Sequence, residues 1–251
     1  MSRQARIAAA FGLGAGTYDD AAPIQRAAAR RLARRIAAQW PKAPPRRILE
    51  IGCGTGFLSA ELAALFPEST LVLTDIAPAM LQRCQARLGA GHAYRVMDGA
   101  HPDADLTGGF DLVVSSLALQ WLPDLRDGLR RLALCLAPGG QLAFATLGQE
   151  SFAAWRQAHA ALGLACGLHA YPEAAAFPWP PGLNGHIAVE WLEEPHASGL
   201  AFLRALKRIG AGQPALGHEP LSPAALRRVL ARFEDGFTAR YQILYGQGFA
   251  A

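Results

Sequence analysis

An acidic residue followed by a run of three glycines, Glu50-Ile-Gly52-Cys-Gly54-Thr-Gly56, is the stretch of this sequence best suited to hold a ligand. Because glycine lacks a Cβ, such a loop turns sharply and lets its backbone approach the ligand closely. A dinucleotide-binding loop would instead read Gly-x-Gly-x-x-Gly, with a pyrophosphate at the N-terminus of the helix that follows. The carboxylate of Glu50 disfavours a phosphate, so the run predicts a cationic ligand.

The segments around this run predict the elements that position it. Residues 46–51, RRILEI, follow a proline-rich stretch and have the apolar character of a buried strand. Residues 57–66, FLSAELAALF, carry apolar side chains at helical spacing. The next apolar segment ends in Asp75, 19 residues after Gly56, where a carboxylate can accept hydrogen bonds from both hydroxyls of a ribose. Strand, glycine loop and helix in this order make a nucleoside-binding loop credible.

The glycine run resembles motif I of the class I S-adenosylmethionine-dependent methyltransferases, whose cofactor carries a sulfonium and an ammonium but no phosphate. The resemblance continues in AYRVMDGA (93–100), GGFDLVVSSLALQWLPD (108–124) and LRRLALCLAPGGQLAFATL (129–147). It implies that Asp98 hydrogen-bonds the adenine amino group and that Ser115 and Ser116 lie near the methionine moiety.

The resemblance therefore implies S-adenosylmethionine as the cofactor. The residues implied to bind it are Tyr18, Glu50, Gly52, Cys53, Gly54, Gly56, Asp75, Ile76, Met80, Asp98, Gly99 and Ser115. Ile76 and Met80 would flank the adenine plane, although a methionine on a helix also suits a place in the core. The histidines and cysteines show no metal-ligand spacing, so no metal is expected.

Four peripheral stretches resemble one subgroup, the malonyl-acyl carrier protein O-methyltransferases of biotin synthesis. They are IAAAFGLGAGTYDDAAPIQ (7–25), SSLALQWLPDL (115–125), FATLGQES (144–151) and LRALKRIGA (203–211). The resemblance implies transfer of a methyl group to the free carboxylate of a malonyl thioester on acyl carrier protein, forming the methyl ester that primes pimeloyl and biotin synthesis. This carboxylate is ionised at pH 7, so no general base is expected.

Two other functions stay open. The core also resembles the trans-aconitate methyltransferases, which methylate a small carboxylic acid. A methyltransferase-like assembly factor, which binds the cofactor without methylating a small substrate, shares much of the same pattern.

Five residues are candidates for handling the substrate. Tyr18 is predicted to cover the methionine end of the cofactor or the acceptor, and Phe177 to wall an acyl channel. Gln120, Trp121 and Lys207 are the candidates that orient the carboxylate, which must be held without losing its nucleophilicity.

A second glycine run, Gly12, Gly14 and Gly16, has no strand before it. It joins two predicted N-terminal helices and is expected to be a flexible hinge that lets them close over the cofactor.

The predicted fold class is α/β, a Rossmann-like seven-stranded and mostly parallel sheet with helices on both faces. An N-terminal helical lid and an insertion after the fifth strand complete it. The last two strands lie in HIAVEWLEEP and FTARYQILYGQGFA, and the final one enters antiparallel through a hairpin. A single domain of 251 residues is expected, divided into a lid (1–40), a cofactor-binding core (46–147), a lid or substrate insertion (148–185) and C-terminal strands and helices (186–251).

Positive charge is concentrated near the N-terminus. Residues 1–47 contain ten lysines and arginines against two aspartates, although the whole chain has a net charge of only +4. Arg26, Arg30 and Arg34 stand at i, i+4 and i+8 and would form one helical stripe. The stripe is predicted to dock an acidic acyl carrier protein.

Composition argues against several other classes. The basic segment has no interleaved aromatic residues to stack on bases, so no nucleic acid is expected. No apolar stretch reaches the roughly 20 residues that a membrane helix needs. Four widely spaced cysteines and the lack of a recognisable signal peptide predict a cytoplasmic protein, expected to be a monomer.

Overall fold

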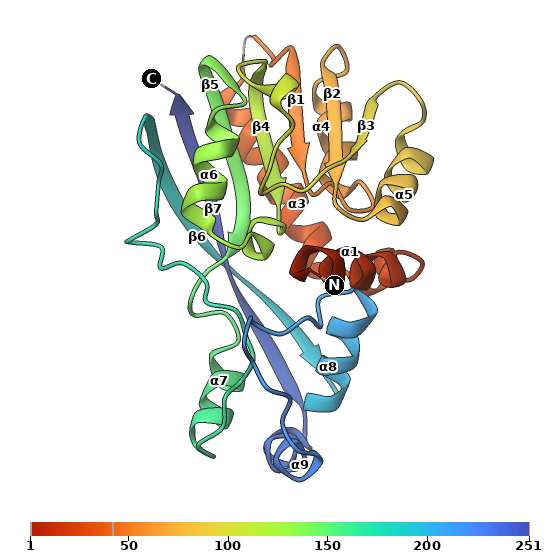
Figure 1. Ribbon diagram of the computed structural model, residues 1–251, viewed down its shortest axis with the longest axis vertical. Coiled ribbons are helices and arrows are strands. Elements are labelled where there is room, and N and C mark those ends of the chain that lie inside the picture. The colour runs from red at the N-terminus through yellow and green to blue at the C-terminus, as the bar shows by residue number, and fades with distance from the viewer. Residues whose placement is uncertain (1, 42, 251) are drawn as a thin grey trace.

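A seven-stranded sheet with the order β3-β2-β1-β4-β5-β7-β6 is the framework of the computed structural model, which describes residues 2–41 and 43–250 (Figure 1). Strands β1 to β5 pair in parallel, and β7 pairs antiparallel with both β5 and β6. The strands are β1 (Arg47–Ile51), β2 (Thr70–Asp75), β3 (Ala93–Val96), β4 (Phe110–Ser116), β5 (Leu136–Leu147), β6 (Leu183–His196) and β7 (Phe237–Ala250). The predicted sheet is confirmed.

Successive strand residues alternate between two hydrophobic cores, because side chains of a strand point to opposite faces. Ile48 of β1 and Leu112 of β4 belong to the core covered by α3 (Pro23–Gln39), α4 (Phe57–Leu65) and α5 (Pro78–Leu88). Their neighbours Leu49 and Val113 belong to the opposite core, which α6 (Leu125–Ala133) covers. Helices therefore lie on both faces, as predicted.

The connection from β6 to β7 is not the predicted hairpin. It contains α8 (Gly199–Arg208), α9 (Pro223–Leu230) and the short η3 (Ala231–Phe233). An alternating pattern identifies two strands but says nothing of the chain between them. The insertion after β5 holds α7 (Ala153–Ala160), and β6 begins at Leu183, before the expected end of the insertion at residue 185. None of the helices in the described residues is long and apolar enough to cross a membrane.

The N-terminal helix α1 (Arg3–Gly14) lies between the sheet and α8, as Figure 1 shows. The predicted glycine hinge is wrong for Gly12 and Gly14, which lie within α1, whereas Gly16 lies in the turn that joins α1 to the next helix. A Cβ on Gly14 would lie 2.9 Å from the backbone oxygen of Arg208, and a Cβ on Gly210 would lie 2.7 Å from the Cα of Phe11. These two glycines let the backbone of α1 rest directly on the end of α8. The short α2 (Tyr18–Ala21) follows at once.

Replacement of Gly210 by alanine should test this contact. Gly210 has φ of +75°, so alanine adds left-handed strain to the clash with α1. We expect Gly210→Ala to lower the free energy of unfolding by about 1–2 kcal/mol or more in urea denaturation. Gly212→Ala is the matched control, since its Cβ would meet nothing nearer than the Cα of Lys207 at 3.8 Å. Equal stabilities of the two variants would contradict the close contact.

Candidate active site

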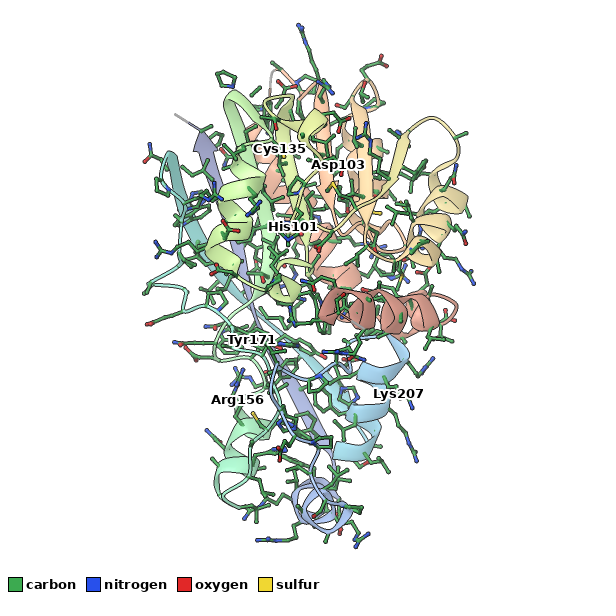
Figure 2. The ribbon with its side chains drawn as sticks, in the orientation of Figure 1. His101, Asp103, Cys135, Arg156, Tyr171 and Lys207 are labelled. Atoms are coloured by element: carbon green, nitrogen blue, oxygen red, sulfur yellow. The ribbon has the colours of Figure 1, made fainter. Side chains whose placement is uncertain are left out.

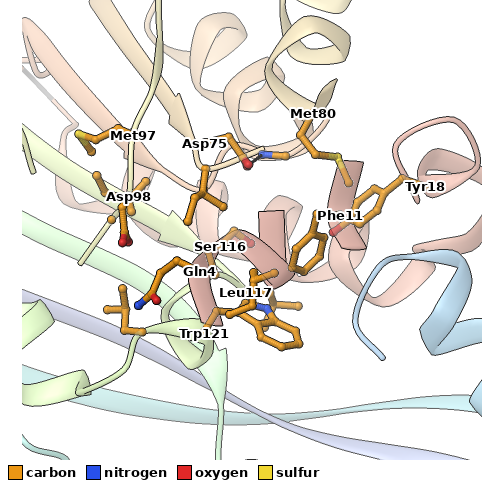
Figure 3. Close-up of a pocket in the computed structure, with 18 residues that line it drawn as sticks. Gln4, Phe11, Tyr18, Asp75, Met80, Met97, Asp98, Ser116, Leu117 and Trp121 are labelled. Atoms are coloured by element: carbon orange, nitrogen blue, oxygen red, sulfur yellow. Dashed lines mark hydrogen bonds between the residues drawn. The ribbon is translucent and has the colours of Figure 1, made fainter. Parts of the chain in front are cut away.

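A first cavity, with about 720 Å³ of empty space, lies at the carboxyl ends of β1 to β4 (Figure 3). The strand order reverses between β1 and β4, and this is where open α/β sheets bind ligands. Each strand end supplies lining residues. Gly52 and Gly54 follow β1, Asp75 ends β2, Asp98 follows β3 and Ser116 ends β4.

Two carboxylates dominate the charge of the first cavity. Asp75 accepts hydrogen bonds from the backbone N–H of Ala77 at 2.8 Å and of Gly54 at 2.9 Å. Burial nevertheless raises the pKa of Asp75 to about 6. Asp98 accepts one from the N–H of Ala100 at 2.9 Å. Among the described residues that line this cavity there is no lysine or arginine. The cavity therefore suits a ligand with positive charge and no phosphate.

The N-terminal helices border the first cavity, and Asp19 anchors α2 there. Its carboxylate accepts a hydrogen bond from Thr55 Oγ1 of the glycine loop at 2.6 Å and forms an ion pair with Arg87 of α5. Its backbone oxygen accepts one from Arg26 of α3 at 2.7 Å. One residue thus ties the lid to the glycine loop and to two helices.

A second cavity, with about 650 Å³ of empty space, adjoins the first. The two cavities share Phe11, Tyr18, Leu117 and Trp121 in their walls. Among the described residues, those lining the second cavity include no Asp, Glu, Lys or Arg. Its polar side chains are instead neutral or weakly basic, namely Tyr18, Gln25, Gln120, His169, Tyr171, Gln213 and Tyr241.

Local strain marks the second cavity. Leu117 and Phe152, with φ of 51° and 59°, are the two non-glycine residues with positive φ in the described part of the chain. Both line the second cavity. Such conformations concentrate at functional sites, where the surrounding packing must enforce them. No sequence signal identified either residue, because neither is of a type that favours this conformation.

Most of the predicted site residues come together. Figure 3 shows Asp75, Asp98, Met80, Tyr18 and Trp121 around the first cavity. The predicted residues that line one or both cavities are Tyr18, Gly52, Gly54, Asp75, Ile76, Met80, Asp98, Gly99, Gln120 and Trp121. The sequence analysis missed Gln4, Ile7 and Phe11 of α1, since a helix docked on the site from outside the glycine motif carries no motif of its own.

Glu50 and Ser115 are corrections. Glu50 is only 1% exposed and accepts a hydrogen bond from Ser59 Oγ at 2.6 Å, behind the glycine loop. Ser115 Oγ donates to the backbone oxygen of Ile51 at 2.9 Å, while its neighbour Ser116 lines the first cavity. Neither predicted residue is among the described residues that line a cavity. The alternation of strand side chains turns both toward the protein interior.

Two members of the glycine loop have a structural place instead. Cys53 is buried and is not among the described lining residues of either cavity. Gly56, at the start of α4, is likewise absent from the described lining of both cavities. A Cβ on Gly56 would lie only 3.0 Å from Cys84 Sγ of α5, so glycine allows α5 to pack closely here.

Lys207 and Phe177 do not line either cavity in the described structure. Lys207 is exposed on α8 (Figure 2), because that helix buries Phe202, five residues earlier and on the opposite side. Phe177 is buried and stacks on Phe144 with ring centroids 5.1 Å apart. Phe177 is thus part of a core, not a channel wall.

Two of the three arginines of the predicted docking stripe on α3 interact with other residues of the protein. The Arg26 guanidinium lies 4.3 Å from the ring centroid of Phe57 and holds the lid. Arg30 forms an ion pair with Glu61 at 3.3 Å. Arg34 is exposed. The stripe is therefore not a row of uncompensated cations.

A family model and solved structures match this chain. Residues 49–142 match the family model described as "Methyltransferase domain". The N-methyltransferase NodS of Bradyrhizobium japonicum, solved with S-adenosyl-L-homocysteine, has a TM-score of 0.52 at 19% identity, over 91% of this chain and 88% of that one. The plantazolicin methyltransferase BpumL gives 0.57 at 14% identity, over 99% and 96%. The fold and the site define an S-adenosylmethionine-dependent methyltransferase.

Sequence relatives narrow the class to a family. A malonyl-[acyl-carrier protein] O-methyltransferase of Magnetococcus marinus is 42% identical, over 98% of this chain and 92% of that protein. One of Methylovorus sp. is 33% identical, over 98% and 88%. The biotin biosynthesis bifunctional protein BioCD of Bordetella avium is 49% identical over 96% of this chain, which spans 51% of that protein's length. The chain belongs to the malonyl-[acyl-carrier protein] O-methyltransferase family, as its sequence predicted.

The buried Glu50 should make stability depend on pH. Burial, followed by the nearby Cys84, raises the pKa of Glu50 from 4.5 to about 8. The protonated carboxyl of Glu50 therefore contributes its full stabilisation of the folded state below pH 4.5. This stabilisation is lost as pH rises through 8. We expect the stability of Glu50→Gln relative to wild type to increase by about 1.4 kcal/mol per pH unit between pH 5 and 8.

Urea denaturation at several pH values measures this difference. The exposed Glu68, which follows α4, offers the control variant Glu68→Gln. Its stability should follow wild type at each pH. A Glu50→Gln curve parallel to that of wild type would contradict the raised pKa.

Proposed function

We propose that this protein transfers the methyl group of S-adenosylmethionine to the free carboxylate of a malonyl thioester on acyl carrier protein, giving the methyl ester that primes biotin synthesis. Family membership supports the reaction. The observation that carries it is the pair of adjoining cavities, one bordered by carboxylates and the other by neutral hydrogen-bonding groups.

The first cavity fits the cofactor. S-adenosylmethionine, when bound, supplies an electrophilic methyl group on a positively charged sulfur. Asp75 would accept hydrogen bonds from the ribose hydroxyls and Asp98 one from the adenine amino group, with Ile76 and Met80 beside the adenine plane. A Cβ on Gly54 would meet nothing within 4 Å, so open space lies over the loop for the ligand.

The second cavity fits a carboxylate acceptor. The acceptor is already an anion at pH 7 and needs orientation more than activation. A lysine or arginine would pair with it strongly and lower its nucleophilicity, whereas amide and phenol groups orient it more weakly. Gln120, Tyr171 and Gln213 are the proposed donors. Burial raises the pKa of Tyr171 to about 12, so its hydroxyl keeps its proton at pH 7.

The closed lid supports transfer between the two cavities. Phe11, Tyr18 and Trp121 line both cavities, and the rings of Phe11 and Trp121 meet in a T-shaped arrangement with centroids 5.3 Å apart. These rings would exclude water from the reacting atoms and hold the acceptor oxygen in line with the methyl group.

A substrate comparison tests the proposed function. Methyl-labelled S-adenosylmethionine is offered with malonyl-acyl carrier protein, acetyl-acyl carrier protein and free malonate in parallel. We expect label on the malonyl carrier alone, released by mild base as methanol. Transfer to free malonate would assign the protein to the small carboxylic acid methyltransferases. Cofactor binding without transfer to any of the three would favour the assembly factor.

Asp98→Asn tests the cofactor assignment. Asparagine keeps an oxygen for the N–H of Ala100, but its NH₂ group cannot accept a hydrogen bond from the adenine amino group. We expect the affinity for S-adenosylhomocysteine, measured by isothermal titration calorimetry, to fall about tenfold. Asp103→Asn, on the exposed turn that follows, should bind as wild type does. Unchanged affinity of Asp98→Asn would remove Asp98 from the site.

A further inference from the structure

A basic surface lies where the outer side of α1 meets the end of α8. We call it the α1–α8 surface and define it by Arg6, Leu13, Lys207, Arg208 and Leu216. Two neighbouring depressions lie on it and share Arg6 and Gln213 in their walls. The described residues lining them include four basic residues, counting Arg3, and no Asp or Glu.

The positive charges of Lys207 and Arg208 are not neutralised within the described part of the protein. Lys207 and Arg208 form no ion pair with any residue that the structure describes. Burial, together with the positive charge of Arg6, lowers the pKa of Arg3. Arg31 and Arg35 of α3 differ, because both pair with Glu190.

Two apolar side chains stand among these charges. Leu13 is 89% exposed and Leu216 is 79% exposed, the highest values among the large hydrophobic residues that the structure describes. Single exposed leucines are ordinary, but two of them beside a cluster of cations suit a partner with an apolar contact surrounded by carboxylates.

The α1–α8 surface also adjoins the second cavity. Gln213 lines the second cavity and both depressions, and His169 lines the second cavity and the depression beside Arg3. His169 Nε2 lies 3.1 Å from the backbone oxygen of Gln213, so these two residues form the wall between inside and outside. A flexible arm that carries an acyl group could pass here from a partner on the surface.

We propose that the α1–α8 surface docks the malonyl-charged acyl carrier protein through an acidic face of the carrier that has an apolar centre. The inference rests on the proposed function and moves the docking site away from the arginine stripe of α3. Charge complementarity selects the partner, and the adjoining second cavity explains why docking here delivers the thioester to the methyl donor.

Charge reversal tests the proposal. In Lys207→Glu/Arg208→Glu we expect the KM for malonyl-acyl carrier protein and the Kd from fluorescence anisotropy of the labelled carrier to rise at least about tenfold. The kcat at saturating carrier and the affinity for S-adenosylhomocysteine should not change. Leu13→Asp, which alters an almost fully exposed side chain, should raise the same KM and Kd.

Arg227→Glu/Arg228→Glu is the matched control. It makes the same change of charge in the last turn of α9, at two exposed arginines outside the lining of both depressions among the described residues. Its KM and Kd should stay within about twofold of wild type, as expected for charges outside an interface.

The possible results separate the two proposals. An equal rise in both double variants, or no rise in either, would overturn docking at the α1–α8 surface. A wild-type dimer that the Lys207→Glu/Arg208→Glu change dissociates, with carrier affinity unchanged, would assign the surface to a second copy of the chain and also overturn it. If wild type binds the carrier through this surface but does not methylate its malonyl group, the proposed reaction fails and the docking site stands.

Discussion

The close contact between α1 and the end of α8 is the constraint on which the site depends. Gly14 and Gly210 remove the two Cβ atoms that would otherwise separate these backbones. Because the backbone of α1 packs directly against α8, Phe11 and Tyr18 lie where the two cavities meet. The same contact brings Arg6 of α1 next to Lys207 and gives the protein a continuous basic surface outside. The packing of α1 on α8 therefore shapes both the two cavities and the α1–α8 surface.

Charge is divided between the cavities in a way that suits reaction of a cation with an anion. The carboxylates of Asp75 and Asp98 border the first cavity and favour a positive ligand there. The described lining of the second cavity has no Asp, Glu, Lys or Arg. An incoming carboxylate is therefore neither repelled by an anion nor bound too tightly by a cation. A strong ion pair at the acceptor would stabilise the ground state more than the transition state, in which the negative charge is being lost.

Two kinds of contact hold the N-terminal helices, and they respond differently to salt. The glycine contacts are steric and change little with pH or salt. Asp19 holds α2 through a hydrogen bond from Thr55 and an ion pair with the partly exposed Arg87, and the ion pair is weakened by salt.

The sequence by itself determined the framework of this protein. Glu50-x-Gly-x-Gly-x-Gly between strand and helix, with Asp75 at the next strand end, was enough to predict the sheet, the cofactor loop and most of the first cavity, because these features are local in the chain. It also indicated the family, which a relative of 42% identity confirms. The resemblance placed both Ser115 and Ser116 near the cofactor, and the alternation of strand side chains turns Ser116, not Ser115, toward the first cavity.

The tertiary structure alone decided everything that depends on distant segments meeting. Whether a glycine bends a helix or lets it pack depends on what lies opposite, and Arg208 lies 194 positions after Gly14 in the chain. Which arginines form ion pairs depends on where acidic residues lie in the fold, and Glu190 of β6 pairs with Arg31 and Arg35 of α3. The second cavity takes its lining from α1, α2, α3, the segment after β4, the insertion, the end of α8 and β7, so its outline depends on how these distant segments pack. Such sites depend on contacts between distant segments, and the residue types and spacing within one segment do not reveal those contacts.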